Sequence, residues 1–353
     1  MQKVKWGEYS FKSIFNNIAQ GRRLKKDDQI SGNIPFVMAG TTNTGIVDYI
    51  SNPVANFPEN SITIDIFGNT FYRDYNFGAG DDTGVYWNSK KEYTKKTMLF
   101  FAISMEKSLF GKFDYGKKLR SSQSLNFKMQ LPTKNGKIDF EFMESFVADL
   151  EAERIKKLDD YLIENGLSNY HLTENEKQAL ENFENLNWNI FNLEKLFGKS
   201  TRGKRLKSTD RISGNLPFIT AGETDEGVSA FIGNKVNVFS ENTTTIDMFG
   251  SAKYRNFKYG GDDHIAVVHT EKLPKLASIF VTTSIHKSSY NGQFNYGRNF
   301  YAKDADTLDI SLPLKGQKPD YETMETIISA IHKLVIKDVV LYTDKKNRIN
   351  QHA

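Results

Sequence analysis

The sequence predicts an α+β protein built from two tandem copies of one mixed strand-and-loop domain, each followed by a long helix. The first observation behind this prediction is a repeat. Ser-Gly-Asn-x-Pro-Phe stands at 31–36 and at 213–218, an offset of 182, and Thr-Ile-Asp-x-Phe-Gly recurs at the same offset from 63–68. The second is the alternation of short β-prone runs with two long amphipathic stretches. A chain of 353 residues is also long enough for two separate cores.

The two copies run nearly in parallel along the chain. The mixed regions are expected at 1–136 and 188–316, where Gly, Asn and aromatic residues separate short apolar runs, a pattern typical of short strands and loops. Farther along, the best letter-by-letter match has an offset of 181, with 80–82 aligned to 261–263. A single-residue deletion near residue 79 would explain the change.

A long helix is expected at the end of each copy, at 137–165 and at 317–343. In both stretches the apolar residues fall within about half of the helix circumference, and Asp139 and Asp320 stand where helix N-caps belong. Each helix would have roughly 24 residues and a length of roughly 36 Å. The simplest arrangement that buries both apolar stripes is an antiparallel, coiled-coil-like pair.

The segment 166–187 is expected to connect the two copies. It contains Thr173-Glu174-Asn175-Glu176, a capping-box pattern that predicts the start of a connector helix. The final segment, 344–353, is polar and is predicted to be a frayed tail.

Several function classes are excluded by what the sequence lacks. The chain has no cysteine, so it forms neither a disulfide nor a cysteine zinc site. It contains no glycine-rich phosphate loop, no Gly-x-Ser-x-Gly and no His-Glu-x-x-His. Of its six histidines only His264 lies inside a strongly matched block, and its counterpart in the first copy is Asp82, so neither a metal site nor a catalytic histidine is expected. Without a secretory leader or a long apolar run, a cytoplasmic protein without membrane contact is expected.

The charge is distributed unevenly. The whole chain has a formal net charge of +4, but 141–186 carries 12 acidic and 4 basic residues, so the rest of the chain must sum to +12. An excess of Lys and Arg on a globular surface favours contact with a polyanion. Ordinary solubilising charge remains the alternative.

Basic residues cluster at corresponding places in the two copies, beside Asn, Gln, Ser and aromatic residues. This mixture suits DNA, since Lys and Arg bind phosphates while Arg, Asn and Gln contact base edges. The residues expected to bind DNA are Arg22, Arg23, Lys25, Arg73, Lys117, Lys118, Arg120, Lys204, Arg205, Lys207, Arg255 and Arg298.

Residues that differ between the copies on the same loops are candidates for base reading, because the DNA backbone is the same at both sites while the bases are not. The two pairs of loops are 42–44 with 224–226 and 121–124 with 301–304. The base-reading candidates are Thr42, Asn43, Gln123, Thr224, Asp225 and Lys303.

Two other function classes remain open at this point. The carboxylates Asp65 and Asp247 occupy equivalent places, as do those at 81–82 and 262–263, and paired carboxylates could support an enzyme. An Asp between a strand and a turn more often caps backbone N–H groups. The Tyr-, Phe- and Asn-containing loops would also suit a duplicated carbohydrate-binding module.

The order of these motifs resembles the specificity (S) subunits of multisubunit restriction–modification systems, of type I or type IIB. The resemblance covers 4–342. It is carried by Trp188–Phe197, by the two Gly-x-Arg-Leu-Lys loops, by the two repeated motifs and by the helix openings with Met143 and Met324. S subunits have two target-recognition domains whose long helices pair as an antiparallel spacer.

The resemblance implies that this chain is not itself catalytic and holds no cofactor. It implies binding to double-stranded DNA at a bipartite site with a non-specific gap. An adenine-N6 methyltransferase subunit, or a fused nuclease–methyltransferase subunit, would dock on the helices and supply S-adenosylmethionine and Mg²⁺. The helices are shorter than those of many type I subunits, which favours type IIB and a gap of about one DNA turn. The residues expected at the partner contacts are Met143, Val147, Leu150, Met324, Ile328 and Ile331.

Overall fold

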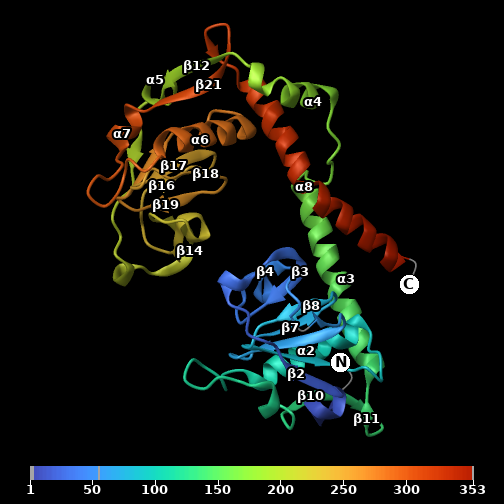
Figure 1. Ribbon diagram of the computed structural model, residues 1–353. Coiled ribbons are helices and arrows are strands. Elements are labelled where there is room, and N and C mark those ends of the chain that lie inside the picture. Colours follow the sequence, from blue (N-terminus) through green and yellow to red (C-terminus); the bar gives the residue numbers. More distant parts are fainter. Residues whose placement is uncertain (1–3, 55, 352–353) are drawn as a thin grey trace. The chain divides into compact units, whose positions relative to one another are not determined.

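The computed structural model describes residues 4–54 and 56–351 and divides into two compact units, which meet in sequence between Leu158 and Asp159 (Figure 1). The first unit contains β1 (Lys5–Ser10), α1 (Phe11–Ile14), β2 (Asn17–Gln20), η1 (Lys26–Asp28), β3 (Ser31–Val37), η2 (Thr42–Gly45), β4 (Ile46–Ile50), β5 (Asn56–Phe57), β6 (Ser61–Asp65), β7 (Thr70–Arg73), β8 (Phe77–Ala79), β9 (Thr83–Trp87), α2 (Lys95–Leu109), η3 (Ser121–Gln123), β10 (Lys128–Lys134), β11 (Lys137–Ile138) and most of α3 (Phe140–Glu164).

The second unit repeats this order after a connector. It contains the end of α3, α4 (Glu174–Glu181), η4 (Phe183–Asn185), β12 (Trp188–Asn192), α5 (Leu193–Phe197), β13 (Thr201–Arg202), η5 (Ser208–Asp210), β14 (Ser213–Ile219), η6 (Thr224–Gly227), β15 (Val228–Ile232), β16 (Val238–Phe239), β17 (Thr243–Asp247), β18 (Ala252–Arg255), β19 (Tyr259–Gly261), β20 (Ile265–Val268), α6 (Lys275–Ser289), α7 (Ala302–Asp306), β21 (Asp309–Lys315), β22 (Lys318–Pro319) and α8 (Tyr321–Gln351).

The sheets of the two units have the same topology. In the first unit the strand orders are β2-β9-β6-β7, β4-β3-β8-β5 and β1-β10-β11. In the second unit they are β13-β20-β17-β18, β15-β14-β19-β16 and β12-β21-β22. Among the residues that the structure describes, the strand pairs are antiparallel except β3 with β8 and β14 with β19. The duplication in the sequence is therefore a duplication of the fold, and the α+β prediction is confirmed.

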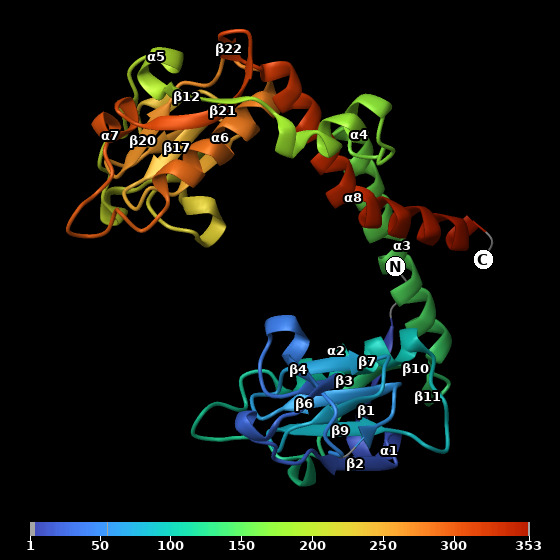
Figure 2. The ribbon, with the colours of Figure 1, turned by 45° about the horizontal axis from the view of Figure 1, so that its top comes forward.

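The larger core of each domain forms between a central strand and one covering helix, and a smaller apolar cluster lies among the strands of the two four-stranded sheets. All five residues of β6 are buried, and α2 packs against this sheet and against β10 (Figure 2). Helix α2 begins after Thr94, whose side chain accepts a hydrogen bond from Thr97 N at 3.2 Å. Aromatic rings fill the space beneath it, with Phe11 edge-on to Tyr86 at 6.0 Å between ring centroids. Helix α6 covers β17 and β18 in the same way.

The strand register corrects the alignment of the two copies. Gly21 N donates to Thr83 O at 2.9 Å, and Gly203 N donates to Ile265 O at 3.0 Å, so the offset of 182 continues through β9 and β20. The predicted deletion near residue 79 is wrong. Between these strands and the helices α2 and α6 the offset falls to 180, because the residue before α2 is Thr94 and the residue before α6 is Pro274. It is 181 at the turns that follow, where Gly116 N and Gly297 N make equivalent hydrogen bonds. Equal letters had been aligned where the backbone pairing is different.

The predicted frayed tail is also wrong. Helix α8 continues through the segment 344–351. The other two residues of the predicted tail, 352–353, lie outside the described residues. Thr343 is buried, and Asn347 Nδ2 donates to Asp159 Oδ2 at 3.1 Å in the last turns of α3. Tertiary contacts of this kind extend a helix whose sequence is polar. The pairing of α3 with α8 along their lengths stays a prediction.

Most of the residues expected at the partner contacts are buried in their own domains. Met143 and Met324 are fully buried in the cores beneath α2 and α6, and Val147 and Ile328 are less than a tenth exposed. Their assignment as partner contacts is wrong, because the start of each long helix packs on its own domain. Leu150 and Ile331, 43% and 40% exposed, remain accessible.

Candidate nucleic-acid interface

Three loops and one turn meet at one end of the first domain and form a surface that we call its loop face, made of 21–26, 39–45, 80–82 and 114–123. Arg22 N donates to Ala79 O at 2.9 Å, and Ala39 N donates to Asp82 Oδ2 at 3.0 Å. Leu119 N donates to Ile66 O at 2.9 Å, just after β6. Segments that are distant in sequence are thus joined by hydrogen bonds that backbone N–H groups donate.

The second domain has the same loop face, made of 203–208, 221–227, 262–264 and 295–304. Lys204 N donates to Gly261 O at 2.8 Å, and Phe300 N donates to Met248 O at 2.8 Å. Leu206 N donates to the Asp262 carboxylate at 3.2 Å. The two loop faces are therefore equivalent in backbone but not in side chains.

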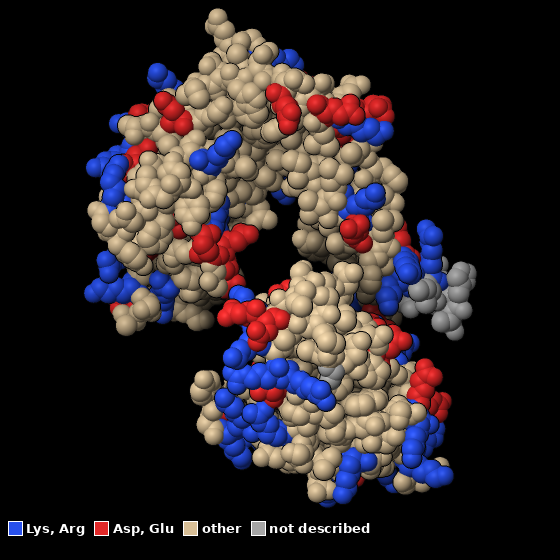
Figure 3. Space-filling model, viewed as in Figure 1, with Lys and Arg blue, Asp and Glu red and all other residues tan. Residues whose placement is uncertain are grey.

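Basic side chains surround both loop faces, and Figure 3 shows Lys and Arg gathered on part of the surface of the first unit. The structure brings most of the predicted DNA-binding residues to these surfaces in exposed positions. They are Arg22, Arg23, Lys25, Lys117, Lys118, Arg120, Lys204, Arg205, Lys207 and Arg298. Some are oriented by neighbouring residues, since Arg298 Nη2 lies 3.2 Å from Asp304 Oδ1.

Arg73 and Arg255 are corrections to the predicted DNA contacts, because they are only 2% and 1% exposed. Their Nε atoms donate to Thr63 Oγ1 at 3.0 Å and to Thr245 Oγ1 at 2.9 Å. Burial lowers the pKa of both guanidinium groups, yet arginine remains protonated in proteins. The β-strands in which they lie turn these side chains inward, so they cannot reach a phosphate.

The tips of the loop faces carry four of the base-reading candidates. Thr42 and Asn43 are exposed at one tip, and Thr224 and Asp225 are exposed at the other. In both domains an aspartate at the end of the central strand bonds to the base of the tip. Asp65 accepts a hydrogen bond from Gly40 N at 3.1 Å, and Asp247 accepts one from Gly222 N at 3.3 Å.

The other pair of base-reading candidates, Gln123 and Lys303, is not equivalent. Gln123 Oε1 accepts a hydrogen bond from Arg120 N at 3.1 Å, and the residue that does this in the second domain is Asp304, which accepts from Tyr301 N at 2.8 Å. The prediction that Gln123 and Lys303 correspond is wrong. The pairing of 121–124 with 301–304 assumed an offset of 180 between the copies, whereas the hydrogen bonds give an offset of 181 and make Asp304 the equivalent of Gln123. Both side chains are nevertheless exposed on their loop faces.

Asp65 and Asp247 have structural roles rather than the arrangement of a catalytic pair. Asp65 Oδ1 accepts from Phe67 N at 2.8 Å and Asn69 N at 3.0 Å, and its Oδ2 accepts from Asn69 Nδ2 at 2.7 Å and Gly40 N at 3.1 Å. A carboxylate has about four lone-pair sites, so these bonds use all of them. Asp247 makes the equivalent bonds to backbone N–H groups, which favours the capping alternative.

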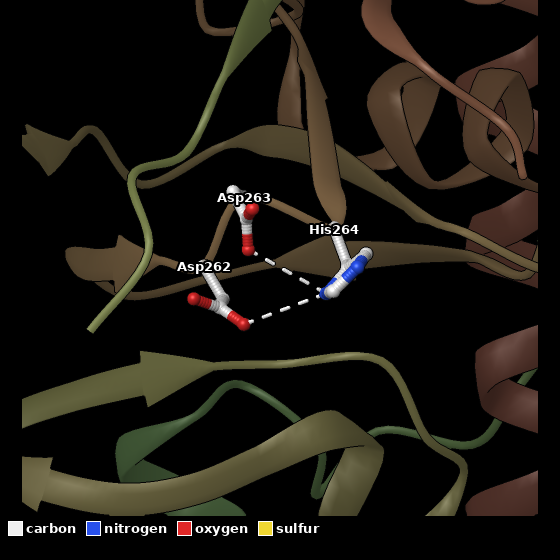
Figure 4. Close-up of side chains that lie close together, drawn as sticks. All are labelled: Asp262, Asp263 and His264. Carbon is white, nitrogen blue, oxygen red and sulfur yellow. Dashed lines mark ion pairs between the residues drawn. The ribbon is translucent and has the colours of Figure 1, made fainter. Parts of the chain in front are cut away.

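One cluster of possible metal ligands lies on the second loop face (Figure 4). His264 Nδ1 lies 3.7 Å from Asp262 Oδ2 and 3.5 Å from Asp263 Oδ1. Asp263 also pairs with Arg202, whose Nη2 lies 3.6 Å from Asp263 Oδ2. Both carboxylates therefore position the basic loop 202–207, and the first domain has Gly80 in place of Asp262.

Sequence reasoning missed two exposed tyrosines on the loop faces. Tyr115 is 81% exposed and Tyr296 is 85% exposed, each at the tip of a tight turn. Asp114 Oδ1 accepts from Gly116 N at 2.8 Å, and Asn295 Oδ1 accepts from Gly297 N at 2.9 Å. The signal was the repeated Phe-Asp/Asn-Tyr-Gly motif, which stands at 113–116 and at 294–297.

Within 4–54 and 56–351, no helix has the length and apolar character needed to cross a membrane.

Comparisons with known proteins agree with this duplication. A family model described as the type I restriction modification DNA specificity domain matches twice, over 3–160 and 185–341. A relative from Heyndrickxia coagulans, the type II restriction enzyme BcgI specificity subunit, is 20% identical, over 94% of this chain and 96% of its own. The type I restriction-modification S subunit from M. genitalium is 15% identical and has a TM-score of 0.62, over 98% of this chain and 93% of its own. The chain therefore belongs to the type I restriction–modification DNA specificity family, carries two copies of its domain, and is a specificity subunit that serves DNA sequence recognition in a restriction–modification system.

Proposed function

We propose that the chain recognises a bipartite site in double-stranded DNA, with one half-site on each loop face and a non-specific gap between them. The observation that carries this proposal is that two domains present the same backbone surface with different tips. Equivalent basic residues such as Arg22 and Lys204 suit the sequence-independent phosphates. Equivalent tip positions that carry different side chains, such as Asn43 and Asp225, suit two different sets of bases.

We also propose that methyltransferase and nuclease chemistry belongs to partner subunits that dock on the long helices. The partner would be an adenine-N6 methyltransferase subunit or a fused nuclease–methyltransferase subunit, which would bring S-adenosylmethionine and Mg²⁺. Exposed apolar side chains on α8, Leu334 at 51% and Val335 at 74%, support docking there. A neighbouring pocket of about 560 Å³, lined by Trp188, Phe280 and Ile331 among others, offers further apolar surface in the second unit.

Salt-dependent binding of the full chain to duplex DNA tests the first proposal. We expect Arg22→Ala and Arg205→Ala each to weaken binding to all sequences and to reduce the slope of log K against log salt by roughly one. Lys134→Ala and Lys315→Ala are the matched controls, since both lysines are exposed at equivalent hairpins outside the loop faces and pair with glutamates. An unchanged slope in both arginine variants would refute their assignment as phosphate contacts.

A further inference from the structure

Each loop face contains a turn in which two successive residues have a left-handed backbone conformation. We call these the tip turns, 40–45 and 222–227. Asn43 and Thr44 have φ of 46° and 52°, and Asp225 and Glu226 have φ of 47° and 54°. Side chains other than Gly disfavour this region, and Thr and Glu more than Asn and Asp. Two adjacent residues adopt it in both domains, so the surrounding structure must hold it.

The buried arginines are what hold the tip turns. Arg73 Nη2 donates to Thr44 O at 2.6 Å, and Arg255 Nη2 donates to Glu226 O at 2.8 Å. Each bond ends on the carbonyl of the second left-handed residue. The Nε atom of each arginine is fixed by a threonine of the central strand, Thr63 in the first domain. Arginine suits this role because its planar fork bonds a strand and a loop at once.

The tip turns are also anchored at both ends. The Asp65 and Asp247 carboxylates accept hydrogen bonds from Gly40 N and Gly222 N at the first residue of each turn. At the last residue, a Cβ on Gly45 would lie 2.7 Å from Met38 O, which leaves no space for a side chain. The turns are thus fixed at their ends and at their strained residue, while their tips stay exposed.

We infer that Arg73 and Arg255 are positioning residues that hold the tip turns in the conformation in which Asn43 and Asp225 meet DNA bases, each for its own half-site. The inference rests on the proposed recognition of two half-sites. A loop that is already ordered loses less conformational entropy on binding, so its contacts contribute more to discrimination. The arginines themselves contact no DNA.

Selection from a randomised duplex library, with the full chain, tests this inference. We expect Arg73→Lys to lower the preference at the bases of the first half-site by about tenfold and to leave the second half-site unchanged. Arg255→Lys should do the reverse, so each variant is the control of the other. Because the charge is kept and no phosphate contact is removed, the salt dependence should not change.

A second pair of variants and a second measurement separate positioning from folding. Gly45→Ala and Gly227→Ala disturb the same turns from their other end and should reproduce the loss at one half-site each. Hydrogen–deuterium exchange of Arg73→Lys should rise over 40–46 while α2 stays protected. Loss of both half-sites in one variant, or no loss in any variant, would overturn the inference. Failure of the unmodified chain to select any duplex would instead count against the proposed function.

Discussion

At the scale of single residues, the two tips differ in hydrogen-bonding chemistry. Asn43 both donates and accepts, whereas the Asp225 carboxylate only accepts. In the major groove Asn matches adenine through N6 and N7, while an acidic side chain accepts from the amino group of cytosine. We therefore expect Asp225→Asn to shift the preferred base at one position of the second half-site from cytosine towards adenine, by roughly tenfold. Asn43→Asp is the reciprocal variant, which should shift a preference in the first half-site from adenine towards cytosine. Selection from a randomised duplex library measures the preferred bases of both variants. A shift in the wrong half-site would contradict the assignment.

The two buried arginines are satisfied to different degrees. Arg73 Nη1 donates to Thr44 Oγ1 at 3.1 Å and to the Tyr75 hydroxyl at 3.0 Å. The equivalent positions in the second domain are Glu226 and Phe257, and among the described residues Arg255 Nη1 has no hydrogen-bond partner. A buried donor without a partner destabilises the folded state. The second tip turn is thus held by fewer bonds than the first.

Phe257→Tyr would supply the missing acceptor by copying the first domain. We expect it to raise the free energy of unfolding of the second unit by about 1 kcal/mol, as measured by denaturant titration of the full chain. Tyr75→Phe removes the same hydroxyl from the first domain and should cost a similar amount. If Phe257→Tyr is neutral while Tyr75→Phe destabilises, the hydroxyl does not reach Arg255.

At the scale of elements, the tight turns at 114–117 and 295–298 each present one exposed tyrosine close in sequence to a basic residue. Lys118 Nζ lies 4.6 Å from the centroid of the Tyr115 ring, and Arg298 is the basic neighbour of Tyr296. We expect Tyr115→Ala and Tyr296→Ala to weaken duplex binding roughly tenfold, whereas Tyr161→Ala, exposed on α3 away from the loop faces, should not. Fluorescence anisotropy measures the affinity. Full binding by both variants would show that these turns stay clear of DNA.

One carboxylate of the connector helix α4 bonds to two residues of α8. Glu176 accepts from Ser329 Oγ at 2.7 Å, from Lys333 Nζ at 2.8 Å and from Thr173 N at 2.7 Å. Burial opposes ionisation of this carboxyl group, but the bonds from Lys333, Ser329 and Thr173 outweigh it and lower the pKa to about 2. The capping box predicted from the sequence is thus present, with an ion pair to α8 that the sequence did not indicate.

Removing this charge should destabilise the second unit in a pH-dependent way. We expect Glu176→Gln to lower its free energy of unfolding by roughly 2 kcal/mol at pH 7. Because the folded pKa lies below the ordinary value of 4.5, the carboxylate contributes fully above that pH and its contribution is lost as the pH falls towards 2. Unfolding at pH 7 and pH 3 should show the difference shrinking. Glu174→Gln, in an exposed pair with Lys177, is the control with little effect.

At the scale of the whole molecule, the sequence predicted the duplicated α+β fold because a repeat is visible without any tertiary information. It did not predict that Arg73 is buried, since a basic residue after a strand is usually exposed and only β7 turns it inward. It placed Met143 on a partner surface, since helical periodicity shows an apolar stripe but not what the stripe packs against. The strained tip turns carry no sequence signal, because Thr44 and Glu226 are unfavourable there and long-range bonds impose their conformation.

The two long helices predict a fixed gap between the half-sites. Helix α3 has 25 residues and α8 has 31, which correspond to about 37 Å and about 46 Å. If they pair as the proposed antiparallel spacer, they cannot lengthen as a flexible linker would. The gap would then be a property of the protein and not of the DNA sequence between the half-sites.

Binding to duplexes that carry the selected half-sites at different separations tests this property. We expect 5 additional base pairs to reduce affinity to that of a duplex with one half-site, because the second half-site turns to the opposite side of the DNA. Ten additional base pairs, about one full turn, bring the second half-site back to the same side of the DNA but increase the separation of the half-sites by roughly 34 Å. A rigid spacer does not bridge that distance, so affinity should stay low, with a duplex lacking one half-site as the control. Recovery at ten base pairs would show that the domains are joined flexibly and that the helices do not set the gap.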